Sequence, residues 1–291
     1  DGTPKPNGGF SFIIGNPPWE IVKPDLREFY AQYDPKIEHG YKRAEAEAII
    51  TKLNAEHPEY LTEYTASTTN IEQTARYIKQ STHYTQQGKG DSATHKMFIE
   101  RAWSLLRPDG FLGYVVPSGI YSDLGTKQLR QLLFDNGRMI VMAGLSNVRG
   151  AFPSIDSRFK FTLLAVQKGG KTESFPVTFR IGYDDYPPLR DDFNRDDVLR
   201  AVLYDKNAYF HMTIPTIQRF SPDTLSLMEF KSADAYRVAD KLYADHPRLG
   251  DIIAGIWNLK FTNELHMTND RHLFEEDELA STGIKRLPLY E

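Results

Sequence analysis

Short apolar runs alternate with amphipathic stretches along the first part of the chain. The runs are nearly continuous, which is typical of strands that are covered on both faces of a sheet. Four of them predict strands, and these are residues 11–14, 111–118, 138–147 and 158–168.

The segments between these runs differ in character. Residues 91–110 and 122–137 each carry an apolar stripe at helical spacing and end at a glycine. Residues 25–60 are charged and predict helices, whereas residues 65–90 are polar and predict an excursion from the core. Because residues 148–157 hold no helix of useful length, the last two strands are predicted to be antiparallel, and the earlier strands, joined by helices, parallel. The sequence therefore predicts an α/β fold, half of a doubly wound sheet.

The pattern changes after Lys168. The next segment is acidic and rich in turn residues, with six aspartates from Asp184 to Asp197, and predicts a solvated connector. A mixed segment follows it, with one helical stretch and an aromatic-rich end. The predicted parts of the chain are residues 1–180, 181–220 and 221–291.

Composition bounds the class of protein. With 291 residues, of which 40% are hydrophobic and 25% charged, the chain can bury a sizeable core. No apolar stretch approaches the roughly 20 residues that span a bilayer, and the first residues lack the basic and apolar parts of a signal peptide. We therefore expect a cytoplasmic protein without a membrane partner. The absence of cysteine excludes disulfides, thiolate nucleophiles and cysteine-ligated zinc.

The net charge of −4 is unevenly distributed. Residues 1–180 carry 22 Lys+Arg against 19 Asp+Glu, whereas residues 181–291 carry 13 against 20. A nucleic-acid partner is therefore expected to contact the first part of the chain.

The stretch Gly15 to Trp19, GNPPW, directly follows the first predicted strand. In open α/β sheets, ligands bind outside the carboxyl ends of the strands. The two prolines restrict the backbone, so the amide of Asn16 is aimed and, together with the Pro17 carbonyl, offers two acceptors beside an indole. This set suits a flat, neutral ligand with an NH2 group, whose lone pair becomes available as the nitrogen turns tetrahedral. Taken alone, the same residues could form a rigid turn.

Asn16-Pro17-Pro18-Trp19 matches the (Asn/Asp/Ser)-Pro-Pro-(Tyr/Phe/Trp) motif of amino-group DNA methyltransferases that use S-adenosylmethionine. Its context adds three segments: HKMFIERAWSLLRPDGFLGYVVPSGIY, AFPSIDSRFKFTLLAVQK and FTNELHMTNDRHLF. With these, the chain resembles large adenine-specific methylases, namely the single-chain type IIG restriction-modification enzymes and the methylases of the BREX and DISARM phage-defence systems.

The resemblance implies a fold and a reaction. The four predicted strands would be strands four to seven of a Rossmann-like methyltransferase sheet, the last one antiparallel. The target would be an adenine flipped out of double-stranded DNA, with its exocyclic amine methylated directly. Trp19 would stack on this base, and Phe159 or Phe161 would line the opposite wall. Because these two phenylalanines alternate on a strand, one of them is expected to face the core.

The resemblance also shows what the sequence lacks. Relatives carry a glycine-rich cofactor loop and an acidic residue for the ribose upstream of the motif, and neither occurs here. We therefore expect the sequence to be part of a longer protein. Asn16, His95 and Phe98 are the cofactor-binding residues that it offers. Residues 221–291 would begin a target-recognition region or its connector, and other subunits of a defence complex are further expected partners.

Two other classes of protein share parts of this pattern. Motifs of the NPP(Y/F) kind also serve methylation of release-factor glutamine and of guanine in ribosomal RNA. Those enzymes are compact, so residues 181–291 favour DNA. A non-catalytic DNA-binding or assembly module would have no need for the amide of Asn16.

Two weaker signals point to metal chemistry. Asp223, Glu229 and Lys231 spell a PD…ExK nuclease pattern, but five residues barely allow the two converging strands that such a site needs, so we interpret the segment as structural. His266 and His272 have no acidic or sulfur partner at ligand spacing. No metal site is predicted.

Overall fold

The computed structural model describes residues 8–88, 90–153, 155–186, 195–248 and 250–251. Residues 1–244 form one compact unit. In the described parts of the chain, no helix combines the length and the apolar character that crossing a membrane requires.

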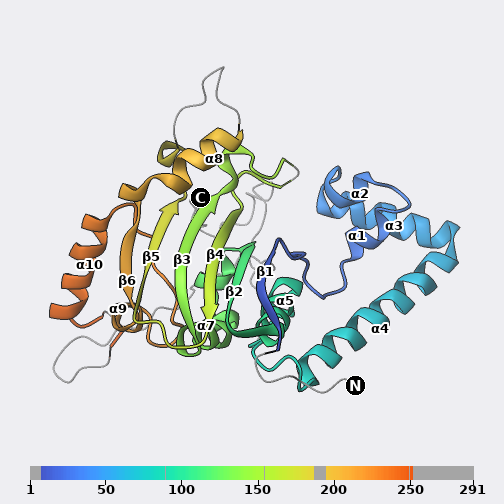
Figure 1. The fold of residues 1–291 in the computed structure, drawn as a ribbon. Helices are drawn as coiled ribbons and strands as arrows, with labels where there is room; N and C mark the ends of the chain where they lie inside the picture. Colours follow the sequence, from blue (N-terminus) through green and yellow to red (C-terminus); the bar gives the residue numbers. More distant parts are fainter. Residues whose placement is uncertain (1–7, 89, 154, 187–194, 249, 252–291) are drawn as a thin grey trace. The chain divides into compact units, whose positions relative to one another are not determined.

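Six strands form one mixed sheet in the order β1-β2-β4-β3-β5-β6 among the described residues (Figure 1). The strands are β1 Phe10–Gly15, β2 Leu106–Pro117, β3 Gly137–Ser146, β4 Lys160–Lys168, β5 Ser174–Arg180 and β6 Phe210–Thr213. β1 pairs parallel to β2, and β3 parallel to β5. β4 lies between β2 and β3 and is antiparallel to both. The predicted Rossmann-like α/β fold, with its last predicted strand antiparallel, is confirmed.

The helices fall into an insertion after β1 and a set around the sheet. The insertion contains α1 Leu26–Tyr30, α2 Lys36–His39, α3 Arg43–Glu56 and α4 Pro58–Gln80. The others are α5 Thr94–Leu105, α6 Gly119–Ser122, α7 Lys127–Asp135, α8 Arg195–Tyr204, α9 Ile214–Phe220 and α10 Ala233–Asp245. Short 3-10 turns are η1 Leu124–Thr126, η2 Asn147–Arg149, η3 Tyr183–Asp185 and η4 Lys206–Ala208.

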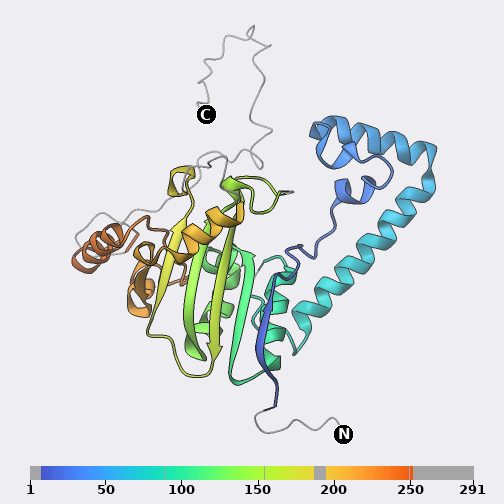
Figure 2. The ribbon, with the colours of Figure 1, turned by 45° about the horizontal axis from the view of Figure 1, so that its top comes forward.

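The alternation of side chains along β2 separates two apolar layers. Leu112 and Val116 are fully buried in a cluster with Ile99 of α5 and Leu129 of α7. Val115, on the opposite face, belongs to a second cluster that includes residues of α8. Helices α5 and α7 therefore cover one face of the sheet and α8 lies on the other (Figure 2). The insertion has its own core, built on Tyr30, Ile37, Ala46 and Ile50.

Most of the polar stretch 65–90, which was expected to leave the core, belongs to helix α4, of whose residues only Ile78 is buried. Three threonines on this helix, Thr65, Thr69 and Thr74, donate their hydroxyls to the carbonyl four residues earlier at 2.8, 2.8 and 2.9 Å. Hydroxyls bonded in this way stay compatible with the helix. The excursion is therefore helical, which the polar composition of the stretch did not indicate.

Strands β5 and β6 were not predicted either. β5 has the period-2 pattern of a strand, with Phe175 and Val177 fully buried, but Pro176 interrupts it. The proline is tolerated because pairing with β3 begins only at Val177. The sheet therefore continues beyond residue 180, and the functional division at residues 180 and 220 stays a prediction.

At one edge of the sheet, β1 pairs only with β2 among the described residues. Phe12 and Ile14 on this strand are 63% and 82% exposed. Exposed apolar side chains on a parallel edge strand are typical of a surface that further polypeptide covers.

Replacing Leu112 with alanine tests the layer between the sheet and α5. The substitution is expected to lower the free energy of unfolding by about 2–5 kcal/mol, because it removes buried methyl groups and leaves a cavity. Urea denaturation measures the change. Val238→Ala on α10, where Val238 is 59% exposed, is the control and should cost less than about 0.5 kcal/mol. Equal losses in the two variants would contradict the assigned core.

Candidate functional site

The GNPPW motif lies at the carboxyl end of β1, where β1 pairs with β2 as far as Gly15 and Tyr114. Asn16 is exposed, and its side-chain amide makes no hydrogen bond to any described residue. Pro17 is buried and Pro18 is exposed. The amide is therefore free to bind a ligand at the predicted edge of the sheet.

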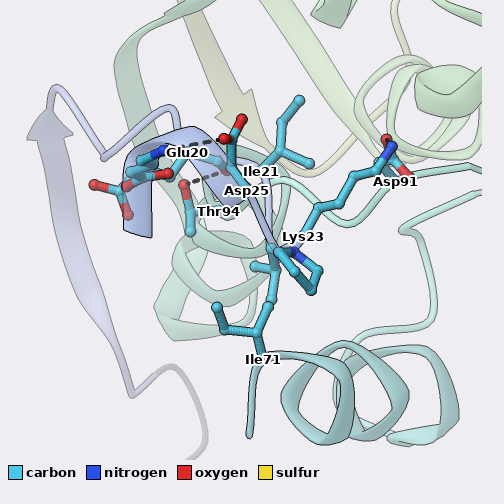
Figure 3. Close-up of a pocket in the computed structure, with 10 residues that line it drawn as sticks. Glu20, Ile21, Lys23, Asp25, Ile71, Asp91 and Thr94 are labelled. Atoms are coloured by element: carbon cyan, nitrogen blue, oxygen red, sulfur yellow. Dashed lines mark hydrogen bonds and ion pairs between the residues drawn. The ribbon is translucent and has the colours of Figure 1, made fainter. Parts of the chain in front are cut away.

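The chain leaving the motif is fixed by the start of α5. Ile21 and Ala93 form an antiparallel bridge, flanked by hydrogen bonds from Thr94 N to Glu20 O at 2.9 Å and from Val22 N to Ser92 O at 2.7 Å. Thr94 also directs its hydroxyl to this segment (Figure 3). The motif is thus anchored on both sides.

Trp19 is partly buried and held by three contacts. Its indole Nε1 donates to the carbonyl of Val115 at 3.3 Å. Its ring stacks on Phe159, with centroids 5.6 Å apart and planes 10° apart. The edge of Phe152 meets the same ring at 5.2 Å. The motif's aromatic residue therefore faces an aromatic partner supplied from the start of β4.

Phe159 and Phe161 occupy different environments. Phe159 is 38% exposed and contacts Trp19, whereas Phe161 is 3% exposed and packs edge-on against Phe152 at 5.0 Å. Of the two predicted wall residues, Phe161 faces the core, so its ring supports the site and is not available to stack on a base. Phe159 remains the candidate for the opposite wall.

Asn147 builds the loop that carries these rings. It is 1% exposed, and its side chain donates to the carbonyls of Phe152 and Ile155 at 2.9 and 2.7 Å while accepting from Phe152 N at 2.8 Å. Its backbone amide donates to Phe159 O at 2.8 Å. Sequence reasoning missed both Asn147 and Phe152. The local sequence pattern that could have indicated this loop is an asparagine followed three residues later by Gly150. The structure gives Gly150 a φ of 66°, which suits a glycine.

His95 and Phe98, the other two predicted cofactor residues, differ in exposure. His95 is 7% exposed, and burial, assisted by the charge of Lys96, lowers the pKa of its imidazole to about 4. Its Nδ1 has no hydrogen-bond partner among the described residues. Phe98 is 47% exposed. Of the three predicted cofactor residues, Asn16 and Phe98 are therefore accessible to an adenosyl cofactor, and His95 is enclosed.

A cavity of about 610 Å³ opens directly after the motif (Figure 3). Its lining includes four carboxylates, from Glu20, Asp25, Glu28 and Asp91, with Lys23 as the basic residue. Lys23 lies 3.6 Å from Asp91. Neither Asn16 nor Trp19 lines this cavity, and its negative charge opposes a phosphate backbone. It is therefore not the candidate base pocket.

The segment with the PD…ExK pattern packs into the core through Leu225, Leu227 and Phe230. No strand is formed between residues 221 and 231. Glu229 accepts hydrogen bonds from Tyr121 OH at 2.7 Å and from Lys160 Nζ at 2.8 Å, and burial together with the Glu229 carboxylate raises the pKa of Tyr121. Its carboxylate is thereby engaged within the fold. His266 and His272 lie outside the described residues.

Part of the chain matches the model of a known protein family. Residues 63–152 match the family model of the Eco57I restriction-modification methylase. The matched region includes α5, β2 and β3 and begins after the GNPPW motif. This region is therefore similar to the methylases of restriction-modification systems. No curated protein matches the chain.

Several solved structures are similar over part of their length. A type I methyltransferase subunit from Streptococcus thermophilus is 14% identical, with a TM-score of 0.38 over 52% of this chain and 33% of that chain. The type I restriction enzyme EcoKI M protein is 15% identical, with a TM-score of 0.36 over 58% of this chain and 47% of that chain. The type IIG restriction endonuclease BpuSI is 18% identical, with a TM-score of 0.29 over 37% of this chain and 12% of that chain. The chain spans less than half of each of these proteins.

The burial of His95 predicts a pH dependence of stability. The pKa of His95 falls from 6.5 to about 4 on folding, so the unfolded chain binds more protons between these pH values. The free energy of unfolding should therefore decrease as the pH is lowered from about 6.5 to about 4, by an amount on the order of 2–3 kcal/mol from this residue.

Urea unfolding at several pH values measures this contribution. A His95→Gln variant should lose stability less steeply below pH 6.5 than the wild type. His211→Gln, at an exposed position of β6, controls for removal of an imidazole. Parallel pH profiles for the wild type and His95→Gln would refute the assignment.

Proposed function

We propose that this chain carries the target-base site of a DNA methyltransferase that uses S-adenosylmethionine. The enzyme transfers a methyl group to the exocyclic amine of an adenine flipped out of double-stranded DNA, as part of a restriction-modification or phage-defence system in the cytoplasm. The observation that carries the proposal is the free amide of Asn16 beside the Trp19–Phe159 pair, at the carboxyl edge of the sheet. The match of residues 63–152 to a restriction-modification methylase favours DNA over ribosomal RNA or a protein glutamine as substrate.

Asn16 and Pro17 would activate the amine without a strong base. The two N–H groups of the amine donate to the Asn16 side-chain oxygen and to the Pro17 carbonyl, which suits a nitrogen that is becoming tetrahedral. Its lone pair then leaves conjugation with the ring. S-adenosylmethionine, when bound, supplies an electrophilic methyl group on a sulfonium. The chain contributes position and orientation, which are worth several kcal/mol in reactions of this kind.

The aromatic pair sets the space for the base. Trp19 and Phe159 have centroids 5.6 Å apart. A base between them needs about 7 Å, twice the ~3.4 Å stacking repeat of DNA. Trp19 is fixed by Val115 and Phe152, so we propose that Phe159 gives way as the adenine enters. Stacking on Trp19, worth about 1–3 kcal/mol, would offset part of the cost of extruding the base.

The remaining parts of the proposal concern DNA. The excess of basic residues in residues 1–180 favours this part as the surface that contacts the phosphates. Sequence specificity would come from base contacts made by a region that residues 221–291 begin, together with other subunits of the system. Most of that region lies outside the described residues.

Asn16→Ala is expected to reduce methyl transfer at least ~100-fold, because removing one aimed hydrogen-bonding group costs about 3 kcal/mol or more. DNA affinity should stay within about twofold, since the amide acts on the flipped base. Transfer of labelled methyl groups from S-adenosylmethionine into duplex DNA, followed by base analysis, measures both the rate and the methylated base. Asn70→Ala, at an exposed position of α4, is the matched control. Near-normal transfer by Asn16→Ala would refute the mechanism, and label in another base would refute adenine.

Two substitutions of Trp19 separate its ring from its N–H. Trp19→Ala removes the stacking platform and should lower kcat/KM for DNA by about 5- to 150-fold, the equivalent of 1–3 kcal/mol. Trp19→Phe keeps an aromatic face but loses the bond to Val115 and part of the ring area, so a loss of less than about tenfold is expected. Equal losses in both variants would show that the ring face is not used.

A further inference from the structure

We infer that Thr94 is a positioning residue for the catalytic motif: its hydroxyl fixes the Pro18 carbonyl and thereby the direction in which Asn16 and Pro17 present their acceptors. The inference rests on the proposed function and adds a residue that the motif itself does not contain. Because its hydroxyl donates to the Pro18 carbonyl, Thr94 would act through the backbone of the motif.

The contact is short and specific. Thr94 Oγ1 lies 2.7 Å from Pro18 O and 3.1 Å from Glu20 O. A hydroxyl has one hydrogen to donate, so the shorter contact to Pro18 is the principal one. The backbone amide of Thr94 bonds Glu20 O separately, at 2.9 Å. Loss of the hydroxyl would therefore release the Pro18 carbonyl while leaving the chain crossing in place.

This bond controls a torsion that proline leaves open. The proline rings of residues 17 and 18 fix φ, but the direction of the Pro18 carbonyl depends on ψ. Upstream, the motif is held at Gly15 by the pairing of β1 with β2. With Thr94 holding Pro18, only Asn16 and Pro17 lie between two anchors. Those are the two residues proposed to bind the amine.

Thr94 can serve as an anchor because α5 is immobilised. Ile99 and Trp103 on this helix are buried in the main core. On another side, Lys96 Nζ donates to Gln87 O at 3.1 Å and Asp91 O at 2.9 Å, which fixes the loop before the helix. The exposed motif is thus bonded to one of the most enclosed helices of the fold.

A helix-capping role does not account for the hydroxyl. The residue at the N-cap of α5 is Ala93, which makes no side-chain cap. A threonine that capped the helix would accept a hydrogen bond from a backbone N–H group in the first turn of α5. Thr94 instead donates to a carbonyl 76 positions away in the sequence.

Thr94→Val tests the inference in the intact protein, because valine has nearly the same shape and lacks the donor. We expect kcat for methyl transfer to fall about 10- to 100-fold, with KM for DNA and the affinity for S-adenosylmethionine within about twofold. Thr94→Ser, which restores the hydroxyl, should recover kcat to within about threefold. Thr69→Val removes a hydroxyl-to-carbonyl bond in α4 and should change neither quantity.

Hydrogen exchange gives a readout that does not need activity. The amides of Asn16, Trp19 and Glu20 should exchange faster in Thr94→Val than in the wild type, and those of α5 should not change. Wild-type kcat in Thr94→Val, a failure of serine to rescue, or unchanged exchange in the motif would each overturn the inference. If the wild-type protein transfers no methyl group, the proposed function fails, and exchange still decides whether Thr94 orders the motif.

Discussion

The antiparallel insertion of β4 between β2 and β3 is the constraint on which the site depends. Because β4 runs against its neighbours, its beginning lies at the same edge of the sheet as the ends of β1 and β2. Phe159, which precedes β4, can therefore meet Trp19, which follows β1. In an all-parallel sheet the two rings would lie at opposite edges. One reversal of direction thus brings together residues separated by almost half of the chain.

Around the contact between Trp19 and Phe159, most of the motif is held by fixed contacts, whereas the amide of Asn16 is free to bind a ligand. Trp19 is fixed by a carbonyl of β2 and by Phe152, whose loop is organised by the buried Asn147. Pro18 is bonded to Thr94. The side-chain amide of Asn16, by contrast, makes no hydrogen bond to a described residue. A site built in this way loses little entropy in ordering itself when a ligand arrives, which is the physical meaning of preorganisation.

The features that could be predicted from the sequence are those that depend on local or periodic patterns of residues. The four strands, the antiparallel last pair and the motif at a strand end follow from apolar runs and from the length of one connection. Alternation alone could not say which of Phe159 and Phe161 faces the core, because the choice depends on which face α8 covers. The roles of Thr94 and Asn147 could not be predicted for a similar reason. Their roles lie in contacts with distant or irregular backbone, which no spacing in the sequence encodes.

The most direct test of the central claim is an experimental structure of the intact protein with duplex DNA and a non-reactive cofactor analogue. An extruded adenine should stack on Trp19, with its amine about 3 Å from both the Asn16 side-chain oxygen and the Pro17 carbonyl, and with Phe159 displaced from the indole. An adenine that remains stacked in the duplex while Trp19 and Phe159 keep their contact, or an amine bound away from Asn16, would contradict the claim.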